Sequence, residues 1–486
     1  MKKFSLNYRI KIFCILIFFF FAPFTENADC QQPTKREYWP TSDWKTSSPE
    51  QQGMDSAKLL LADEFIQNRL VDVFSLLVIK NGYLVFEKYY SWGSPEKIAV
   101  VHSVTKSFTS ALIGIALDKG YLDSVDQKLI EFFPEYAADD LDPRIKEIRI
   151  KHILTMSAGF KWNDRGSVMR DWYTSSDWAR FTIQLPLVTN PGDKFNYNSS
   201  ISHLLSIILS KSTKTSTYDF AKQNLFKPLG IQSAFWRQGP QGYHIGGFGL
   251  GLSARDLAKF GFLFLNNGYW NGQSIVPQQW VKKSTEQQIQ AVSHPLYGTF
   301  GYGYHWWVKQ VDGCSSFRAW GRRGQYVVVV PELDLVVAVT SNPALPHPPT
   351  SIHYSPLFDL VAASIKRKRP PKTPLQAVKL PADVKAFIAD FDRARFNKNL
   401  KIMADLISDQ FLHDGVTKQM AVEFLTGNLP YMHEAKIIVT RFEPEGDRAK
   451  IDVFLKDKYF EAPFMTGSKL IKENEYWKWY GNQIAK

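Results

Sequence analysis

One stretch constrains this chain more than any other: the apolar run from Ser103 to Gly120, SVTKSFTSALIGIALDKG. A serine and a lysine open it at positions i and i+3, so in a helix that begins there Ser103 and Lys106 leave the same face of the first turn. The residues after Lys106 are apolar on more of the circumference than one stripe, which is typical of a buried helix. Gly120 is a suitable C-terminal cap. The sequence therefore predicts a core helix with a serine and a lysine at its head.

This pairing has a chemical use. A serine hydroxyl is a poor nucleophile until a neighbouring base takes its proton, and a lysine is such a base only when its surroundings keep the amine neutral. Burial favours the neutral form of Lys106, and the backbone N–H of Ser103 at a helix start can donate to an oxyanion beside the serine. Ser-x-x-Lys also occurs at Ser42–Lys45 and Ser94–Lys97, but only the copy at Ser103 opens an apolar helix pattern. A solvated first helical turn is the alternative for that copy.

The first 28 residues have the pattern of a secretory signal peptide. Basic residues precede an apolar run from Ile12 to Phe24 that is shorter than an ordinary membrane span. We therefore expect an exported protein, periplasmic or secreted, with cleavage after Ala28; a lipid anchor at Cys30 and an uncleaved signal are the alternatives. Cys30 and Cys314 are either paired in an oxidising compartment or free thiols.

Composition limits the partners. The 486 residues carry a formal net charge of +12, and 44% of them are hydrophobic, which suffices for a large core. A basic surface suits anionic cell-envelope material, yet Lys and Arg are spread along the chain and no nucleic-acid module is present. A solvated basic face is the simpler interpretation. We expect a small-molecule or peptide-like substrate, and no metal or organic cofactor is implied.

Strand signals lie at both ends of the first two thirds of the chain. Two apolar runs, Phe74 to Ile79 and Tyr83 to Tyr90, meet at Asn81-Gly82, which is a strong hairpin signal. A strand from Arg318 to Val330 and another from Leu335 to Thr340 form a second predicted hairpin. The fold class predicted is an α/β-type sandwich, in which helices flank an antiparallel sheet.

A basic, proline-rich stretch at 369–376 predicts a linker between two domains, 40–368 and 377–486. The second domain combines predicted helices with predicted strands. The helices are Val384 to Phe396 and Leu400 to Phe411, and the strands are Ile437 to Phe442, Ala449 to Leu455, Phe460 to Leu470 and Tyr476 to Tyr480. This pattern predicts a small α+β domain, and it offers no clustered His, Cys or carboxylate set for a metal.

A second candidate site element follows the turn at Pro191-Gly192. A tyrosine near a serine–lysine pair can relay a proton between nucleophile and leaving group, and Tyr197 is suited to that role. Ser199 or Asn198 can supply a hydrogen bond to the substrate. An aromatic plug under a loop is the alternative for Tyr197. The glycines from Gly246 to Gly251 favour a loop that lines a pocket, or a turn, over a nucleotide site, because no strand precedes them.

The third element is the run from Ala319 to Gln325. Gly321 and Gly324 allow a backbone to approach a substrate, and one N–H there is a candidate second oxyanion donor. A glycine-kinked edge strand is the alternative.

The order of Ser103-x-x-Lys106, Tyr197-x-Ser199 and Gly321-x-x-Gly324 resembles the serine β-lactamase and penicillin-recognising superfamily. Within it the chain is most similar to the class C branch, which includes esterases and 6-aminohexanoate-dimer hydrolases. The resemblance covers roughly residues 45 to 365. Three further stretches support it: Leu154–Gly159, Phe226–Ile231 and Ser253–Asp256.

The resemblance implies a β-lactamase/transpeptidase-like fold with Ser103 as the acylated nucleophile, Lys106 as its base and Tyr197 as the proton relay. Ser199 stands where the family often has Asn. We expect Ser199 to bind substrate.

The same resemblance places Ala319-Trp320-Gly321 where β-lactamases carry Lys-Thr-Gly. Trp320 and Gly321 are then expected to bind substrate, with the Arg322 N–H as second oxyanion donor. An alignment three residues later would put Arg322-Arg323-Gly324 at that position instead.

The part after the linker resembles a nuclear transport factor 2-like domain, a class that binds small molecules, dimerises or supports a neighbour. The function expected is an exported serine hydrolase that forms an acyl-enzyme on small esters or amides. A β-lactamase or D,D-peptidase that acts on cell-wall-type substrates is one alternative, and a catalytically silent penicillin-type binding protein is another.

Overall fold

The computed structural model of the chain describes residues 36–483 apart from gaps at 71–72, 138–140, 295–297, 343–353, 370–373, 414–415, 423–424, 426–434, 460 and 465–466. The predicted signal segment, Cys30 and residues 370–373 of the predicted linker lie outside the described residues. Cys314 is a buried free thiol. Within the described ranges, no helix combines the length and the apolarity needed to cross a bilayer.

A large antiparallel sheet is the centre of the fold. Its eight described strands follow the order β2-β1-β13-β12-β11-β10-β9-β8. They are β1 Val73–Lys80, β2 Tyr83–Tyr89, β8 Ile289–His294, β9 Gly298–Tyr302, β10 Trp307–Val308, β11 Phe317–Gly321, β12 Gln325–Val330 and β13 Leu335–Ser341. The hairpin predicted at Asn81-Gly82 is confirmed, because both residues have positive φ, 54° and 88°, as a tight two-residue turn requires.

The prediction of one strand from Arg318 to Val330 is wrong. Two antiparallel strands, β11 and β12, occupy this stretch, with Gly321 opposite Gln325. The chain reverses because Arg323 and Gly324 both take positive φ, 65° and 87°. Arg322 and Arg323 therefore lie at a hairpin turn, and their side chains do not alternate along a strand. The next predicted hairpin, between β12 and β13, is confirmed.

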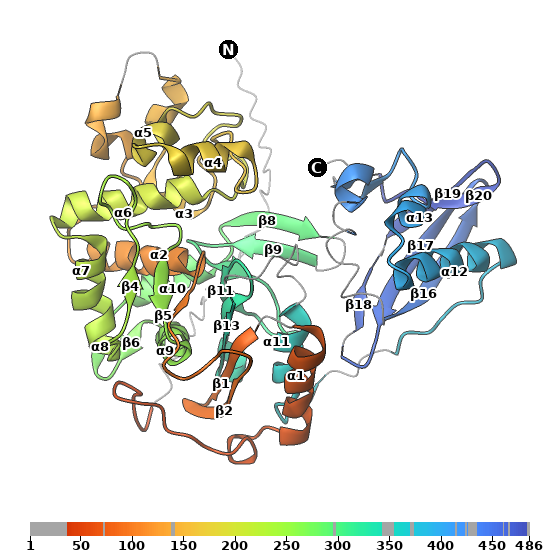
Figure 1. Cartoon of the computed structure of the whole chain (residues 1–486), viewed down its shortest axis with the longest axis horizontal. Helices are drawn as coiled ribbons and strands as arrows, with labels where there is room; N and C mark the ends of the chain where they lie inside the picture. The colour runs from red at the N-terminus through yellow and green to blue at the C-terminus, as the bar shows by residue number, and fades with distance from the viewer. Residues whose placement is uncertain are drawn as a thin grey trace, which may run out of the picture. The chain divides into compact units, whose positions relative to one another are not determined.

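Helices cover both faces of the sheet (Figure 1). On one face lie α2 Val104–Asp118 and α9 Ala254–Leu265, and on the other α1 Ser56–Arg69 and α11 Ser355–Ala363. Alternation along β12 supplies both contacts: Val327 packs toward the α2 side, whereas Val328 packs toward the α1 side. The predicted antiparallel sheet flanked by helices is confirmed.

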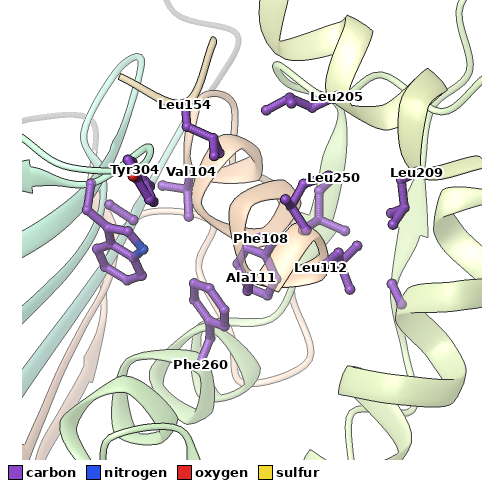
Figure 2. Close-up of a cluster of buried hydrophobic side chains, with 14 of the residues drawn as sticks. Val104, Phe108, Ala111, Leu112, Leu154, Leu205, Leu209, Leu250, Phe260 and Tyr304 are labelled. Atoms are coloured by element: carbon purple, nitrogen blue, oxygen red, sulfur yellow. The ribbon is translucent and has the colours of Figure 1, made fainter. Parts of the chain in front are cut away.

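The predicted core helix is confirmed as α2. It begins at Val104 with Ser103 as its N-cap residue, and every residue from Val104 to Ala116 is buried. Figure 2 shows α2 enclosed by side chains from several other elements, among them Phe260 of α9. The Phe108 and Phe260 rings stack with centroids 3.6 Å apart. Gly120, with φ 71°, follows the end of the helix.

Further helices and small sheets complete the region around α2. The α-helices are α3 Ile150–Leu154, α4 Ser167–Thr174, α5 Trp178–Ile183, α6 Ser199–Thr213, α7 Thr217–Ala221, α8 Lys227–Leu229 and α10 Gln278–Thr285. The small strands are β3 Ala99–Val100, β4 Phe235–Trp236, β5 Leu250–Leu252, β6 Tyr269–Trp270 and β7 Gln273–Ser274.

The C-terminal part has a hydrophobic cluster of its own, centred on Phe391, Ile451 and Trp479. Its elements are α12 Ala382–Phe396, α13 Leu400–Asp405, β14 Leu412–His413, β15 Val416–Thr417, β16 Lys436–Glu445, β17 Arg448–Lys456, β18 Glu461–Pro463, β19 Ser468–Glu473 and β20 Tyr476–Trp479. The resemblance to nuclear transport factor 2-like domains stays a prediction.

Two predicted elements of this part are wrong in extent. The helix from Leu400 ends at Asp405 instead of Phe411, because the next residues bond to β20, where the Ser408 N–H donates to the Trp479 carbonyl at 2.9 Å. The strand predicted from Phe460 to Leu470 is two strands, β18 and β19, which pair with opposite ends of β17.

Packing of α9 on the sheet predicts the effect of a single methyl group. A Cβ at Gly261 would lie 2.5 Å from Val327 Cγ1 and 2.6 Å from Val336 Cγ1. Overpacking of a core costs about 1–3 kcal/mol, whereas Gly to Ala in a helix gains at most about 1 kcal/mol. We expect Gly261→Ala to lower the free energy of unfolding by about 1–2 kcal/mol in urea denaturation. The exposed helical change Lys283→Ala is the control, and an equal or raised stability for Gly261→Ala would contradict the packing.

Candidate active site

The start of α2 presents Ser103 at the surface and Lys106 below it. His102 has a positive φ of 46°, and this turns the chain into the helix immediately before Ser103. Ser103 is partly exposed, whereas Lys106 is 1% exposed. Lys106 Nζ lies 3.1 Å from Ser103 Oγ, so the i, i+3 spacing brings the two groups into hydrogen-bond contact.

Lys106 has two further hydrogen-bond partners from other elements. Its Nζ donates to Ser199 Oγ at 2.9 Å and to the Gly247 carbonyl at 2.8 Å. Burial lowers the pKa of Lys106 to about 8, although the negative charge of Asp164 acts in the opposite direction. An amine with this pKa is partly neutral near pH 7–8, which is the state that a general base requires.

Tyr197 lies beside this pair. Lys106 Nζ is 4.8 Å from the centre of the Tyr197 ring, and the ring stacks on Trp307 with centroids 5.7 Å apart. Burial, and then the charge of Asp164, raises the pKa of Tyr197 above its usual value, whereas a hydrogen bond with Ser103 acts to lower it. The phenol therefore stays protonated at neutral pH and can act as a proton donor.

The strand β11 approaches the nucleophile through Gly321. A Cβ on this residue would lie 2.3 Å from the Val101 carbonyl oxygen and 3.2 Å from Ser103 N, so only glycine permits the contact. Arg322 follows directly, and its proposed role as oxyanion donor stays a prediction. Gly324 lies elsewhere, against Tyr354, where a Cβ would be 2.2 Å from the phenol oxygen. Gly321, from the first of the two alignments, is thus the glycine next to Ser103.

Trp320 is half-buried and belongs to an aromatic group near Tyr197. Its ring centroid is 5.1 Å from that of Trp307 and 5.9 Å from that of Tyr326. Trp320 is the neighbour of Gly321 in β11, so its side chain leaves the face of the sheet opposite the one on which Gly321 meets Ser103. Trp307 connects it to Tyr197. Trp307 was not predicted, and the only sequence signal for it is the unusual pair Trp306-Trp307.

Two more site residues were missed by sequence reasoning. Gly247 supplies the carbonyl that binds Lys106, and a Cβ on it would lie 2.7 Å from the Ser199 carbonyl oxygen. The glycine-rich run predicted a loop that lines a pocket, or a turn, but not its contact with Lys106. Asp164 accepts hydrogen bonds from Ser199, and no motif marks it in the sequence.

His305 forms a hydrogen bond with the backbone of Lys106. Its Nδ1 lies 3.0 Å from the Lys106 carbonyl oxygen, and burial, followed by Lys106, lowers the pKa of His305 to about 3. The imidazole is therefore neutral, and Nδ1–H donates to the helix backbone. In the part of the chain that the structure describes, no three His, Cys, Asp or Glu side chains are grouped so that they could hold a metal ion.

Comparisons with known proteins agree with this geometry. The Beta-lactamase family model matches residues 61–355, which include Ser103, Lys106, Tyr197 and β11. The 6-aminohexanoate-dimer hydrolase of Paenarthrobacter ureafaciens is 24% identical over 306 residues, which are 58% of this chain and 74% of that protein. The octameric penicillin-binding protein homologue from Pyrococcus abyssi has a TM-score of 0.54 at 20% identity and covers 88% of this chain and 98% of its own. At that identity the likeness concerns the fold.

The lowered pKa of Lys106 predicts a pH dependence for the reactivity of Ser103. Below the pKa the amine is protonated and cannot accept the serine proton, so the rate rises with pH and levels off above about 8. We expect this profile for the second-order rate of labelling by diisopropyl fluorophosphate, measured between about pH 6 and pH 10. Lys106→Met should label slowly and without that rise. A wild-type rate that is flat across this range would contradict the assignment of Lys106.

Proposed function

The chain belongs to the Beta-lactamase family of serine hydrolases, and on that premise we propose that it hydrolyses small esters or linear amides through an acyl-enzyme on Ser103. The observation that carries the proposal is the contact between Ser103 Oγ and the buried amine of Lys106 at 3.1 Å. Both the fold and the family support a covalent mechanism that needs no metal.

In the proposed acylation step, Ser103 is the nucleophile and Lys106 is its base. Lys106 in its neutral form takes the proton of Ser103 as Oγ attacks the substrate carbonyl carbon. The carbonyl oxygen becomes negatively charged, and the backbone N–H groups of Ser103 and Arg322 stabilise it. The close approach of Gly321 to Ser103 N supports this pair of donors, because Arg322 is the next residue in the chain.

The leaving group departs with a proton. Tyr197 contacts Ser103 and lies over Lys106, so its phenol can pass the proton from the lysine ammonium to the leaving oxygen or nitrogen. Water then attacks the acyl carbon of the ester on Ser103, and the same groups act in reverse. The serine regains its proton, and the carboxylic acid is released.

The residues aligned with Lys-Thr-Gly support the proposed substrate class. β-Lactamases and D,D-peptidases use that lysine to bind the substrate carboxylate. In the first alignment Ala319 stands at this position and is fully buried, and Trp307, whose ring stacks on that of Tyr197, adds aromatic surface near the site. A relative named for the hydrolysis of the 6-aminohexanoate dimer also supports a linear substrate over a bicyclic lactam.

We further propose that the enzyme acts outside the cytoplasm, since residues 1–28 have the pattern of a secretory signal. For the C-terminal part we propose an accessory role, in dimerisation or in support of the hydrolase region. The basic composition also suits contact with an anionic cell envelope.

Removal of the nucleophile tests the covalent mechanism. We expect Ser103→Ala to abolish labelling by a fluorophosphonate and to lower kcat on p-nitrophenyl butyrate by more than about 10³-fold. Its Tm should stay close to that of the wild type, because the Ser103 side chain makes no capping hydrogen bond to the helix. Mass spectrometry of the labelled peptide is the measurement. Label that remained on the same peptide in Ser103→Ala would show that another residue is the nucleophile.

A comparison of substrates tests the proposed class. We expect kcat/KM for p-nitrophenyl butyrate to exceed that for nitrocefin on the same preparation, because the cation of Lys-Thr-Gly is absent. Arg322 is the residue that could replace it: burial and the neighbouring Arg323 lower its pKa, so guanidinium groups lie close together here. The comparison is therefore repeated with Arg322→Ala and Arg323→Ala. A nitrocefin value at or above the ester value, and sensitive to either arginine, would favour a β-lactamase.

A further inference from the structure

A carboxylate lies directly behind the hydroxyl group that binds the base. Ser199 Oγ is 2.9 Å from Lys106 Nζ on one side and 2.6 Å from Asp164 Oδ2 on the other. Asp164 comes from the loop between α3 and α4, and Ser199 is the first residue of α6. Four side chains thus form an unbroken chain of hydrogen bonds, in the order Ser103, Lys106, Ser199, Asp164.

The chemistry of these groups fixes the direction of each hydrogen bond. A carboxylate oxygen only accepts, so the single hydroxyl proton of Ser199 is donated to Asp164. The lone pairs of Ser199 Oγ are then left to accept an N–H from Lys106. The Gly247 carbonyl, at 2.8 Å, also only accepts, and it takes a second N–H of Lys106.

A neutral amine has two N–H groups and one lone pair. With both N–H groups donated to Ser199 and Gly247, the lone pair of Lys106 is the group left to face Ser103 Oγ at 3.1 Å. If the Ser199 hydroxyl rotated and donated to Lys106 instead, the lone pair would be occupied and the base blocked.

We propose that Asp164 is a positioning residue for catalysis: by holding the Ser199 proton it orients the neutral amine of Lys106 toward Ser103 and stabilises the ammonium that forms. The inference rests on the proposed function, since it concerns the base of that reaction. During attack the proton moves from Ser103 Oγ to Lys106 Nζ and no proton reaches Asp164. The carboxylate therefore acts through Ser199 as the aspartate of a Ser-His-Asp triad acts through its partner.

A purely structural role for Asp164 predicts something different. Asp164 also accepts from the backbone N–H of Ser199 at 2.9 Å and from the Trp162 indole, so it helps to cap α6. That helix already has a cap, because Asn198 Oδ1 accepts from Ser200 N at 2.8 Å and from Ile201 N at 3.3 Å. A second cap affects stability and leaves the properties of Lys106 unchanged.

The charge environment of Lys106 distinguishes the two roles. The charged or titratable groups around it are Asp164, Tyr197, His102 and His305. Burial is the first cause that lowers the pKa of each histidine, so both imidazoles are neutral, and the phenol stays protonated. Asp164 is therefore the charged group among them, and its charge opposes the lowering of the Lys106 pKa. Removing its charge should therefore lower the pKa of Lys106 further and move the rising limb of activity to lower pH.

A double-mutant cycle on the full chain tests the proposal. The variants are Asp164→Asn, Ser199→Ala and the double variant, and the readouts are the rate of fluorophosphonate labelling, its pH profile and the Tm. The matched control is Asp177→Asn, which also removes a helix-capping carboxylate, one that accepts from Arg180 N and from the Tyr136 hydroxyl.

We expect each single variant to label about 10- to 100-fold more slowly than the wild type at pH 7, the size of effect that a misplaced catalytic group produces. The double variant should be no slower than the slower single one, since both changes break the same chain. Only Asp164→Asn should shift the rising limb to lower pH. Asp177→Asn should change the Tm but neither the rate nor the limb.

Three results would overturn the proposal: an Asp164→Asn rate within about twofold of wild type with an unmoved limb, losses that multiply in the double variant, or equal effects in Asp177→Asn. If Asp164→Asn does not fold, the test rests on Ser199→Ala. A labelling rate of Ser199→Ala within about twofold of wild type would then overturn the proposal. A wild type without label on Ser103 overturns the proposed function and this inference with it. If the wild type is labelled on Ser103 but the losses of the two single variants multiply in the double variant, only this inference is overturned.

Discussion

Burial of one amine organises the structure. Lys106 lies at the head of a helix that is buried on all sides, and its depressed pKa corresponds to on the order of 3 kcal/mol of preference against the charged form, compared with water. Such a group is tolerable only where each N–H meets an acceptor. The acceptors come from α6 and from the loop before β5, so these elements must close around the start of α2. The apolar character of α2 thus has a chemical purpose besides stability: it keeps water away from the base.

Close backbone contacts make this convergence possible. A Cβ at Gly247 would collide with the α6 backbone, and one at Gly246 would lie 2.2 Å from the Ser202 carbonyl oxygen. Gly321 similarly lets β11 reach Ser103. At these positions glycine serves for its missing side chain rather than for an unusual φ. The same loop is tied to α2 at a second point, where Thr109 Oγ1 donates to the Gly246 carbonyl at 2.9 Å. The nucleophile, the base and their supports are therefore held by packed backbone segments, which gives a rigid site.

Local signals predicted much of this fold from the sequence. The helix from Ser103 and the hairpin at Asn81-Gly82 were predicted because their periodicity, cap or turn residues are neighbours in the chain. The turn after Gly321 was missed because apolar residues continue on both sides and Arg323 is an uncommon residue at positive φ. Contacts between residues far apart in the sequence could not be predicted: Ser199 and Asp164 are 35 residues apart, and Lys106 and Gly247 are 141 residues apart. Nothing in local periodicity or propensity encodes which acceptor meets which donor across such separations.

Ser199 and Asp164 also account physically for a departure from the family pattern. An asparagine at position 199 would keep its two roles on separate atoms, because its Oδ1 only accepts and its Nδ2 only donates. A serine hydroxyl both donates and accepts and rotates freely, so serine alone leaves the direction of the hydrogen bond with Lys106 undecided. A carboxylate within 2.6 Å removes that freedom, because it takes the only proton that the hydroxyl has. It also places a negative charge near the amine, which an asparagine would not do. Serine at this position is therefore an adequate partner for the base only when a second residue orients it, and in this chain that residue is Asp164.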